Sequence, residues 1–413
     1  MARSSLLTPF EVRSFRFQWP ADLLTSWAIE MEILILGWYI IVETGSVMLL
    51  TVFGSLQYLG TLIAPLFGMA GDRFGHRTVL CAMRAGYTIL AVAVSILIAT
   101  GGMTPMVVLI VAAISGLVRP SDLAMRNALV AETMPPDRLM AAMGVARTTS
   151  DSARIIGSLA GATLLAMLGM GISYVAIALF YAGGMALTTA VTASRGQPHT
   201  AGTPRPGFLR EVREGMVYVW HTPCVLAAMW LAFLVNMTAF PMTSGLLPYV
   251  AKEVYGIGQT GLGTLVASFA TGALLGSIAT SLAGRSLRPA RMMIVFAVAW
   301  YAAVLVFVNV PGPNAGRVML VAAGFAQSLS MVPMAVMLLQ VAGPKLRGRV
   351  MGVRMLAIYG LPVGLLGAGV LIPLVGFTAT ASAYCIFGLA ATLAIALYWR
   401  QAVWPKDAPA NSR

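Results

Sequence analysis

Acidic side chains within a long apolar stretch are the residues of this chain best suited to chemistry. Glu30 and Glu32 lie near the middle of the apolar segment 19–42. A charge at mid-bilayer depth costs about 2.5 kcal/mol or more, so it usually marks a function or an ion pair. A helix turns these two side chains about 200° away from each other, and they should not face one cavity together. We expect one glutamate to carry protons or contact a substrate, and the other to pair within its own half of the chain.

A second set of charges lies in the apolar segment 139–167. Arg147, Asp151 and Arg154 are spaced at i, i+4 and i+7 and therefore share one face of a helix. Asp151 lies roughly 18 Å into the segment, close to the bilayer centre. Two interpretations stay open. The Asp–Arg pair could bind an ionic substrate group or relay protons, or it could be a buried ion pair that stabilises the N-terminal half.

Charged residues nearer the cytoplasm are expected to form a gate. Three of them share one face of segment 105–128, and a further arginine lies in segment 77–100. We expect them to join the glycine-rich loop 68–78, whose Asp72 can accept hydrogen bonds from arginines or from a helix N-terminus. Such a salt-bridged latch can hold one conformation of two packed halves. The predicted gate residues are Gly68, Asp72, Arg73, Gly75, His76, Arg77, Arg84, Arg119, Asp122 and Arg126.

Uncharged polar residues are the candidates for lining a cavity in the C-terminal half, which is poor in buried charge. Asn236, Gln327 and Tyr359 lie in apolar segments that prolines interrupt, and kinks at prolines expose carbonyl groups and create pockets. Hydrogen bonding between helices explains these residues nearly as well. In the N-terminal half we add Tyr39 and Arg147, which share helix faces with the acidic residues above.

The composition indicates which scaffold must position these residues. Of the 413 residues, 59% are hydrophobic and 10% are charged, with a mean hydropathy of +0.84. Soluble proteins carry roughly 25% charged residues, so this chain is not a soluble enzyme, a coiled coil or a disordered protein. Apolar stretches of ~20 residues can span a bilayer, and we predict an all-α membrane protein with twelve transmembrane helices. They lie near 19–42, 46–70, 77–100, 105–128, 139–167, 172–193, 222–250, 259–283, 290–310, 317–342, 349–374 and 377–399.

The distribution of Lys and Arg predicts the orientation of these helices. The formal net charge is +13, yet only Lys252 and Arg317 of the 27 Lys and Arg residues lie in segments assigned to the outer face. This is the positive-inside pattern, and it places both termini in the cytoplasm. The basic charge therefore fixes orientation and does not indicate nucleic acid as a partner.

A long linker divides the chain into two halves. Residues 1–193 are predicted to form an N-terminal six-helix bundle, and residues 222–413 a C-terminal one. The linker 194–221 ends in an amphipathic pattern, which suits a helix on the inner membrane surface or a plain surface helix that ties the halves together. Segments 143–161 and 351–369 share an MGV start and a glycine-rich end. Such repeats predict two pseudo-symmetric bundles that rock against each other around a substrate path.

Sequence motifs for enzyme chemistry, nucleotide binding and metal binding are absent. The sequence has no P-loop pattern, no GxSxG and no HExxH. Its three cysteines and three histidines form no metal-ligand spacing. We therefore expect that the protein is not an enzyme and needs neither a cofactor nor a metal.

Several segments resemble one family of membrane proteins. GMAGDRFGHR at 68–77 resembles the loop signature of the major facilitator superfamily, Gly-x-Leu-Ala-Asp-Arg-x-Gly-Arg-Arg. ALVAETMPPDRLMAAMG, LLPYVAKEVYGIGQTGLGTLVASFATGALLGS and LRGRVMGVRMLAIYGLPVGLLGAG look like its exporter branch, which includes macrolide efflux pumps and the enterobactin exporter. Two departures matter. His76 stands where the family usually has Arg, and the segment 157–162 only loosely matches the Gly-Pro-x-x-Gly-Gly motif of antiporters.

The resemblance implies the major facilitator fold and a monomeric, multi-pass transporter of the bacterial inner membrane. The expected function is proton-coupled export of a small amphiphilic molecule, drug-like or siderophore-like, by alternating access. Coupling requires a carboxylate whose proton affinity differs between the inward-open and outward-open states, which points to Glu30, Glu32 or Asp151, with Arg154 as a further substrate contact. The expected partners are a small-molecule substrate, protons and the lipid bilayer. The alternatives are an uptake carrier or lipid flippase for an anionic amphiphile, and a receptor that does not transport.

Overall fold

All regular structure in the described part of the chain is helical. The computed structural model describes residues 8–192, 208–283 and 288–404, and in these ranges every element is an α-, 3-10 or π-helix. Ten helical stretches in these ranges, two of which join neighbouring elements, are long and apolar enough to cross a membrane, and a bent pair, Val47–Thr61 with Leu66–Phe74, gives an eleventh if it is counted as one span. The prediction of an all-α membrane protein is therefore confirmed.

Two of the long helices bend at a glycine. α6 (Pro136–Thr189) has 54 residues, and a straight helix of that length would measure about 81 Å, against a hydrocarbon core of ~30 Å. Gly169 inside it has φ 74° and ψ 178°, which is open to glycine but strained for other residues, and it bends α6 into two spans. With α6 counted twice, the ten helices and the bent pair make up the twelve predicted spans. α12 (Pro313–Leu356) bends in the same way at Gly343, with φ 62°.

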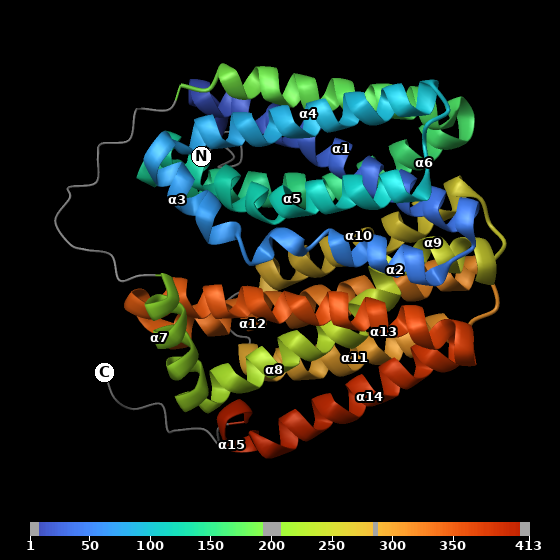
Figure 1. Cartoon of the computed structure of the whole chain (residues 1–413). Coiled ribbons are helices and arrows are strands. Elements are labelled where there is room, and N and C mark those ends of the chain that lie inside the picture. Colours follow the sequence, from blue (N-terminus) through green and yellow to red (C-terminus); the bar gives the residue numbers. More distant parts are fainter. Residues whose placement is uncertain (1–7, 193–207, 284–287, 405–413) are drawn as a thin grey trace. The chain divides into compact units, whose positions relative to one another are not determined.

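The chain divides into two compact units, and the first of them holds most of the buried charge. Unit 1 consists of Met1–Pro204 and Pro248–Ala267. In Figure 1, α1, α4, α5 and α6 run side by side within this unit, and the longest packing surface is between α1 and α6. Besides α6, the helices that belong wholly to unit 1 are α1 (Arg13–Thr44), α2 (Val47–Leu56), α3 (Ala64–Phe74), α4 (His76–Ala99) and α5 (Pro105–Thr133).

The segment Pro248–Ala267 groups with unit 1, although the sequence assigns it to the C-terminal bundle. Gly263, in α10 (Gln259–Ala283), lies so close to α6 that a Cβ there would be 2.4 Å from the Ala162 Cβ. Lys252 Nζ donates a hydrogen bond to the carbonyl oxygen of Ile41 at 2.8 Å, near the C-terminal end of α1. A cation at this end of a helix is favoured by the helix dipole. Close helix packing and this charged cap explain why the segment joins unit 1.

The helix predicted over 46–70 is broken in the structure. α2 and α3 are joined through a 3-10 turn at Leu59–Thr61. At this point the backbone approaches α5 very closely, because a Cβ on Gly60 would lie 2.0 Å from the carbonyl oxygen of Leu117. The close approach needs a glycine and replaces a regular helical path.

The glycine-rich loop predicted over 68–78 is mostly helix, so that expectation was wrong. α3 continues to Phe74, and α4 begins at His76. Only Gly75 turns the chain, with φ 86°, and its N–H donates to the carbonyl oxygen of Gly71 at 2.8 Å. One residue in a left-handed conformation is enough to end one helix and start the next.

Unit 2 consists of Arg205–Leu247 and Ser268–Arg413. The predicted amphipathic helix is present as α7, and it is tied to α12 by an ion pair between Glu214 and Arg349 at 2.6 Å. The Tyr218 hydroxyl adds a hydrogen bond to the carbonyl oxygen of Val341 at 2.9 Å. Besides α12, the helices of unit 2 are α7 (Phe208–His221), α8 (Pro223–Thr238), α11 (Pro289–Asn309), α13 (Gly360–Val375), α14 (Phe377–Tyr398) and α15 (Arg400–Val403).

The helix predicted over 222–250 is irregular in its second half. After α8, the chain forms a π-helical turn at Pro241–Gly245, the short α9 (Leu247–Tyr249), and a second π-helical turn at Val250–Val254. Prolines remove backbone donors and disturb the regular hydrogen-bond ladder. The predicted interruption of this span by proline is therefore a change from α-helical to π-helical backbone.

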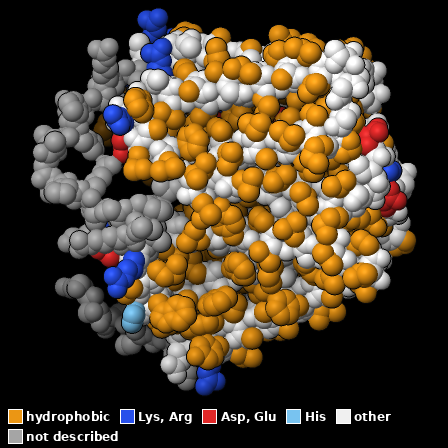
Figure 2. Space-filling model, viewed as in Figure 1, with side chains coloured by type: hydrophobic (Ala, Val, Ile, Leu, Met, Phe, Trp, Pro, Cys, Tyr) orange, Lys and Arg blue, Asp and Glu red, His pale blue; other side chains and the backbone are white. Residues whose placement is uncertain are grey.

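The surface is apolar in the way that a lipid-facing surface must be. Figure 2 shows hydrophobic side chains over most of the visible face, with charged side chains mostly near its left and right edges. Ile89, Leu179 and Leu282 expose 69%, 65% and 82% of their surface. A water-soluble protein rarely exposes such large apolar side chains over an extended patch, whereas lipid tails cover them at no cost.

Candidate functional site

The centre of α1 positions the first charged pair, which we call the midspan pair (Glu32 and Arg119). Glu32 Oε2 lies 2.7 Å from Nη2 of Arg119 on α5, and their side chains are 4% and 12% exposed. The Tyr181 hydroxyl on α6 donates to the same glutamate oxygen at 2.8 Å. Arg119 also donates to the side-chain oxygen of Gln57. Both charges are compensated inside unit 1, where an unpaired buried charge would be strongly destabilising.

Glu30 faces a different side of α1. It is half-buried and lies against α6, where a Cβ on Gly157 would be 3.0 Å from the Glu30 Cβ. Its charge acts on the hydroxyl of Tyr58, which follows α2, together with the charge of Arg154 from α6. Glu30 and Arg154 are therefore electrostatic neighbours of Tyr58, as is Arg119 of the midspan pair. Glu30 is less buried than Glu32, whose side chain is 4% exposed.

A second network, the inner network, lies nearer the N-terminal end of α1. Arg84 on α4 is fully buried and pairs with Asp22 on α1. Asp22 Oδ1 is 3.8 Å from Nε of Arg126 on α5, and the same Nε is 2.5 Å from Oδ2 of Asp122. Arg126 Nη1 donates to Ser26 Oγ at 2.6 Å. Two arginines and two aspartates balance their formal charges and tie α1, α4 and α5 together.

The structure divides the predicted gate residues differently from the sequence analysis. It brings Arg84, Asp122 and Arg126 together, but through Asp22, which was not among the predicted site residues. Arg119 lies apart from them and belongs to the midspan pair. The reason is that the partners of these arginines lie on α1, and one helix face of α5 does not reveal them.

The predicted latch lies at the junction of α3 and α4. His76 Nδ1 is 2.6 Å from Oε1 of Glu132 at the end of α5, and its Nε2 is 4.0 Å from Oδ1 of Asp72. Arg77 donates to the carbonyl oxygen of Thr189 at the end of α6. This junction therefore connects to the ends of α5 and α6. The remaining latch residues in this junction are Gly68, Arg73 and Gly75.

The three charged residues predicted to share one face of segment 139–167, which lies within α6, do not act as one group. Arg147 Nε and Asp151 Oδ2 are 3.1 Å apart, and their side chains are 64% and 23% exposed. An exposed pair of this kind contributes at most about 1 kcal/mol to stability. Arg154 is half-buried, and its charge acts, like that of Glu30, on the hydroxyl of Tyr58.

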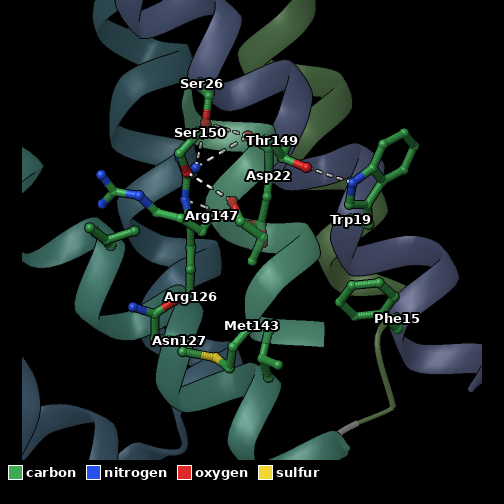
Figure 3. Close-up of a pocket in the computed structure, with 13 residues that line it drawn as sticks. Phe15, Trp19, Asp22, Ser26, Arg126, Asn127, Met143, Arg147, Thr149 and Ser150 are labelled. Carbon is green, nitrogen blue, oxygen red and sulfur yellow. Dashed lines mark hydrogen bonds and ion pairs between the residues drawn. The ribbon is translucent and has the colours of Figure 1, made fainter. Parts of the chain in front are cut away.

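A cavity of about 140 Å³ opens in unit 1 between α1, α5 and α6. Figure 3 shows the rings of Phe15 and Trp19 on one side of it and Arg147 on the other. Arg126 also lines the cavity, so the inner network borders it. The Trp19 ring is fixed by a hydrogen bond from its Nε1 to Thr149 Oγ1 at 2.8 Å. The cavity combines an aromatic wall with two guanidinium groups, and of these residues only Arg147 was predicted to line a cavity.

The other predicted cavity-lining residues lie elsewhere. The Tyr39 hydroxyl donates to the carbonyl oxygen of Met103 at 3.1 Å, just before α5. Asn236 uses its side-chain amide on a carbonyl oxygen of its own helix at 2.8 Å, and Gln327 and Tyr359 are half-buried in unit 2. Within the described ranges, no group of three or more His, Cys, Asp and Glu residues could hold a metal ion.

Comparison with known proteins gives one family and many solved structures. The family model described as Major Facilitator Superfamily matches residues 21–362. A search of curated proteins found no match. The crystal structure of a POT family transporter in complex with 5-aminolevulinic acid is similar, with a TM-score of 0.72 and 13% identity over 94% of this chain and 96% of that one. The nucleoside transporter NupG has a TM-score of 0.70 and 12% identity, covering 94% of this chain and 100% of that one. The human organic anion transporter MFSD10 has a TM-score of 0.62 and 15% identity, covering 93% of this chain and 99% of that one.

Proposed function

The chain belongs to the Major Facilitator Superfamily, and from this membership we propose that it is a proton-coupled exporter of a small amphiphilic molecule. The family makes it a multi-pass secondary transporter of small molecules and not an enzyme. The proposal adds the direction, the coupling ion and the substrate class. The compound would be drug-like or siderophore-like, and alternating access would carry it outward across a bacterial inner membrane.

The contrast between the two glutamates of α1 carries the proposal for proton coupling. Glu32 is sealed in the midspan pair, with Arg119 at 2.7 Å and the Tyr181 hydroxyl at 2.8 Å. Two donors from other helices therefore occupy the same oxygen of Glu32. Glu30 is half-buried beside Tyr58 and Arg154, where small movements of α6 would change its surroundings. We therefore assign Glu30 as the proton carrier and Glu32 as a structural anchor.

Export and a cytoplasmic location of both termini are supported by the sequence. The strong bias of Lys and Arg toward one set of loops favours the inner face for both ends of the chain. The segments 246–277 and 346–369, the second of which covers the end of α12 and the start of α13, resemble the exporter branch that includes macrolide efflux pumps and the enterobactin exporter. Monomeric function is proposed because each described unit builds its own compact helical bundle.

The coupling proposal can be tested in proteoliposomes that contain a trapped pH-sensitive dye and an acidic interior. Erythromycin serves as a macrolide probe, and 2,3-dihydroxybenzoate as a catecholate probe. Addition of a transported probe outside should make the interior less acidic, because the protein exchanges probe for protons. Glu30→Gln should abolish this proton flux and retain exchange of radiolabelled probe across a membrane without a pH gradient.

A matched control separates coupling from general damage. Glu43 lies on the same helix and is exposed near its end, so Glu43→Gln should leave the proton flux unchanged. Proton flux in Glu30→Gln equal to that of the unmodified protein would refute the assignment of Glu30. Probe accumulation driven by co-movement with protons would instead favour an uptake carrier, and probe movement that ignores the pH gradient would favour a flippase.

A further inference from the structure

We propose that the cavity between α1, α5 and α6 binds the carboxylate group of a small amphiphile, with its apolar part against Phe15 and Trp19. The binding site is a property of unit 1 alone. Its role as a station on the export path rests on the proposed function.

Arg126 provides a donor that the protein itself does not use. Its side chain is 7% exposed, its Nη1 donates to Ser26 Oγ at 2.6 Å, and its Nε faces Asp122 at 2.5 Å. Its Nη2 has no hydrogen-bond partner among the residues that the structure describes. Buried donors in native proteins are nearly always satisfied. An acceptor atom in the adjoining cavity would complete the bonding of this guanidinium.

Arg147 provides a second guanidinium at the open side of the same cavity. It lines the cavity and is 64% exposed, and only its Nε faces Asp151, at 3.1 Å. A guanidinium carries five N–H donors, so most of them remain directed at solvent or at a ligand. Guanidinium groups recognise planar carboxylates through paired hydrogen bonds. Two of them at one cavity favour an oxygen anion over a neutral or cationic group.

The acidic residues near the cavity do not cancel this preference. Asp22 lines the cavity, but its carboxylate is held by the fully buried Arg84, which is outside the lining. Asp122 pairs with Nε of Arg126, and Asp151 pairs with Nε of Arg147. Neither aspartate lines the cavity. A ligand that enters the cavity therefore meets unused guanidinium donors before it meets an unpaired carboxylate.

The rest of the lining suits an apolar group. Phe15, Trp19, Val130 and Met143 line the cavity, and the hydrogen bond from Trp19 to Thr149 at 2.8 Å holds the indole ring in place. The volume of about 140 Å³ is below the ~300 Å³ at which drug-sized sites begin. The cavity therefore fits a small aromatic or aliphatic acid, or the acidic end of a larger amphiphile.

The position of the cavity gives it a place in the transport cycle. Ser26, which contacts Arg126, lies one helical turn before Glu30, a rise of about 6 Å along α1. An anion at Arg126 and a proton at Glu30 would thus be held by neighbouring turns of one helix. If each binds better in the presence of the other, the reciprocal effect must also hold, and substrate binding would influence proton uptake.

The test compares three probes of nearly equal shape: phenylacetate, phenylacetamide and phenethylamine. Their dissociation constants are measured on the full-length protein in detergent by saturation-transfer NMR. We expect phenylacetate to bind at least tenfold more tightly than the other two. Arg147→Gln should weaken phenylacetate binding at least threefold and leave phenylacetamide binding unchanged, whereas Trp19→Leu should weaken both. Arg213→Gln, at an exposed arginine of α7, is the matched control and should change neither.

The outcomes separate this inference from the proposed function. Equal affinities for phenylacetate and phenylacetamide, or an Arg147→Gln protein that binds phenylacetate normally, would overturn the carboxylate site. Preferred binding of phenethylamine would do the same. Proton-coupled flux of erythromycin by a protein that fails these binding tests would remove the site and leave the exporter proposal standing. Phenylacetate binding that passes every comparison, in a protein without proton flux, would support the site and remove only its place in export.

Discussion

Removing one member of the midspan pair should destabilise the protein strongly. Glu32→Gln leaves the Arg119 charge with 12% of its side chain exposed and with Gln57 as its remaining partner. Arg119→Gln leaves the Glu32 carboxylate with only the Tyr181 hydroxyl, at 2.8 Å. Loss of one partner from a buried ion pair costs about 3–5 kcal/mol. Since a neutral hydrogen-bond partner remains in each case, we expect the lower end of this range for both variants.

The double variant measures the coupling free energy between the two charges. Glu32→Gln combined with Arg119→Gln removes both charges and leaves two amides that can bond to each other, so neither side is left as a buried ion. The loss of unfolding free energy should fall below the sum of the two single losses by about 2–3 kcal/mol, near the upper limit for residues in contact. Asp151→Asn is the matched control, because its partner Arg147 is 64% exposed and the pair should contribute at most about 1 kcal/mol.

The free energy of unfolding can be measured by titration of mixed micelles with sodium dodecyl sulfate, followed by circular dichroism. The four proteins of the cycle and the Asp151→Asn control are compared at one pH and one ionic strength. If the single losses simply add in the double variant, the two charges do not stabilise each other and the argument for a structural Glu32 fails. A loss in Asp151→Asn equal to that in Glu32→Gln would show that burial does not set the magnitude.

Two further changes test the helix contacts of unit 1. Gly60→Ala should lower the free energy of unfolding by about 1–3 kcal/mol, because the new Cβ would lie 2.0 Å from the carbonyl oxygen of Leu117. The control is Gly68→Ala, whose new Cβ meets nothing within 4 Å and should have little effect. Equal losses of unfolding free energy in the two variants would contradict the close approach at Gly60. Lys252→Met should remove the hydrogen bond to Ile41 at 2.8 Å and cost about 1 kcal/mol. Amide hydrogen exchange of the last turn of α1, followed by mass spectrometry, should become faster, and unchanged exchange would show that Lys252 does not cap the helix.

Most of the fold could be predicted from the sequence because lipid imposes a simple rule. Each span must be a run of apolar residues that forms a helix, so hydropathy alone locates the spans. The breaks were harder to predict, because they depend on backbone conformation and on neighbours. Gly169 and Gly343 bend α6 and α12 without a polar loop to mark the bend. Gly60 breaks α2 from α3 because α5 passes within van der Waals distance, which no local pattern reveals.

The charged residues could be selected from the sequence, but their partners could not be assigned from one helix at a time. The sequence does give the position of each residue along its helix axis. The helices α1 and α5 run in opposite directions; positions 22 and 32 are about 15 Å apart along α1, and positions 119 and 126 are about 10 Å apart along α5. The long arginine side chains can span the difference of about 5 Å between these two spacings. Opposite directions then predict that Glu32 meets Arg119 and that Asp22 meets Arg126, as the structure shows. The cavity could not be found this way, because it depends on how three helices pack.

The geometry of α1 gives a reason why one helix can serve both stability and transport. Its buried acids, Asp22 and Glu32, are neutralised by arginines from α4 and α5, so they fix α1 in the bundle and add no net charge. Ser26, which lines the cavity, and Glu30 lie between them and are half-buried. These two anchors hold α1 on both sides of Ser26 and Glu30, so in the proposed cycle we expect a change in charge at Glu30 to act on the packing of α6. Under the proposal that Glu30 carries the proton, coupling is expected to travel through α6 at Gly157, where an added Cβ would lie 3.0 Å from the Glu30 Cβ.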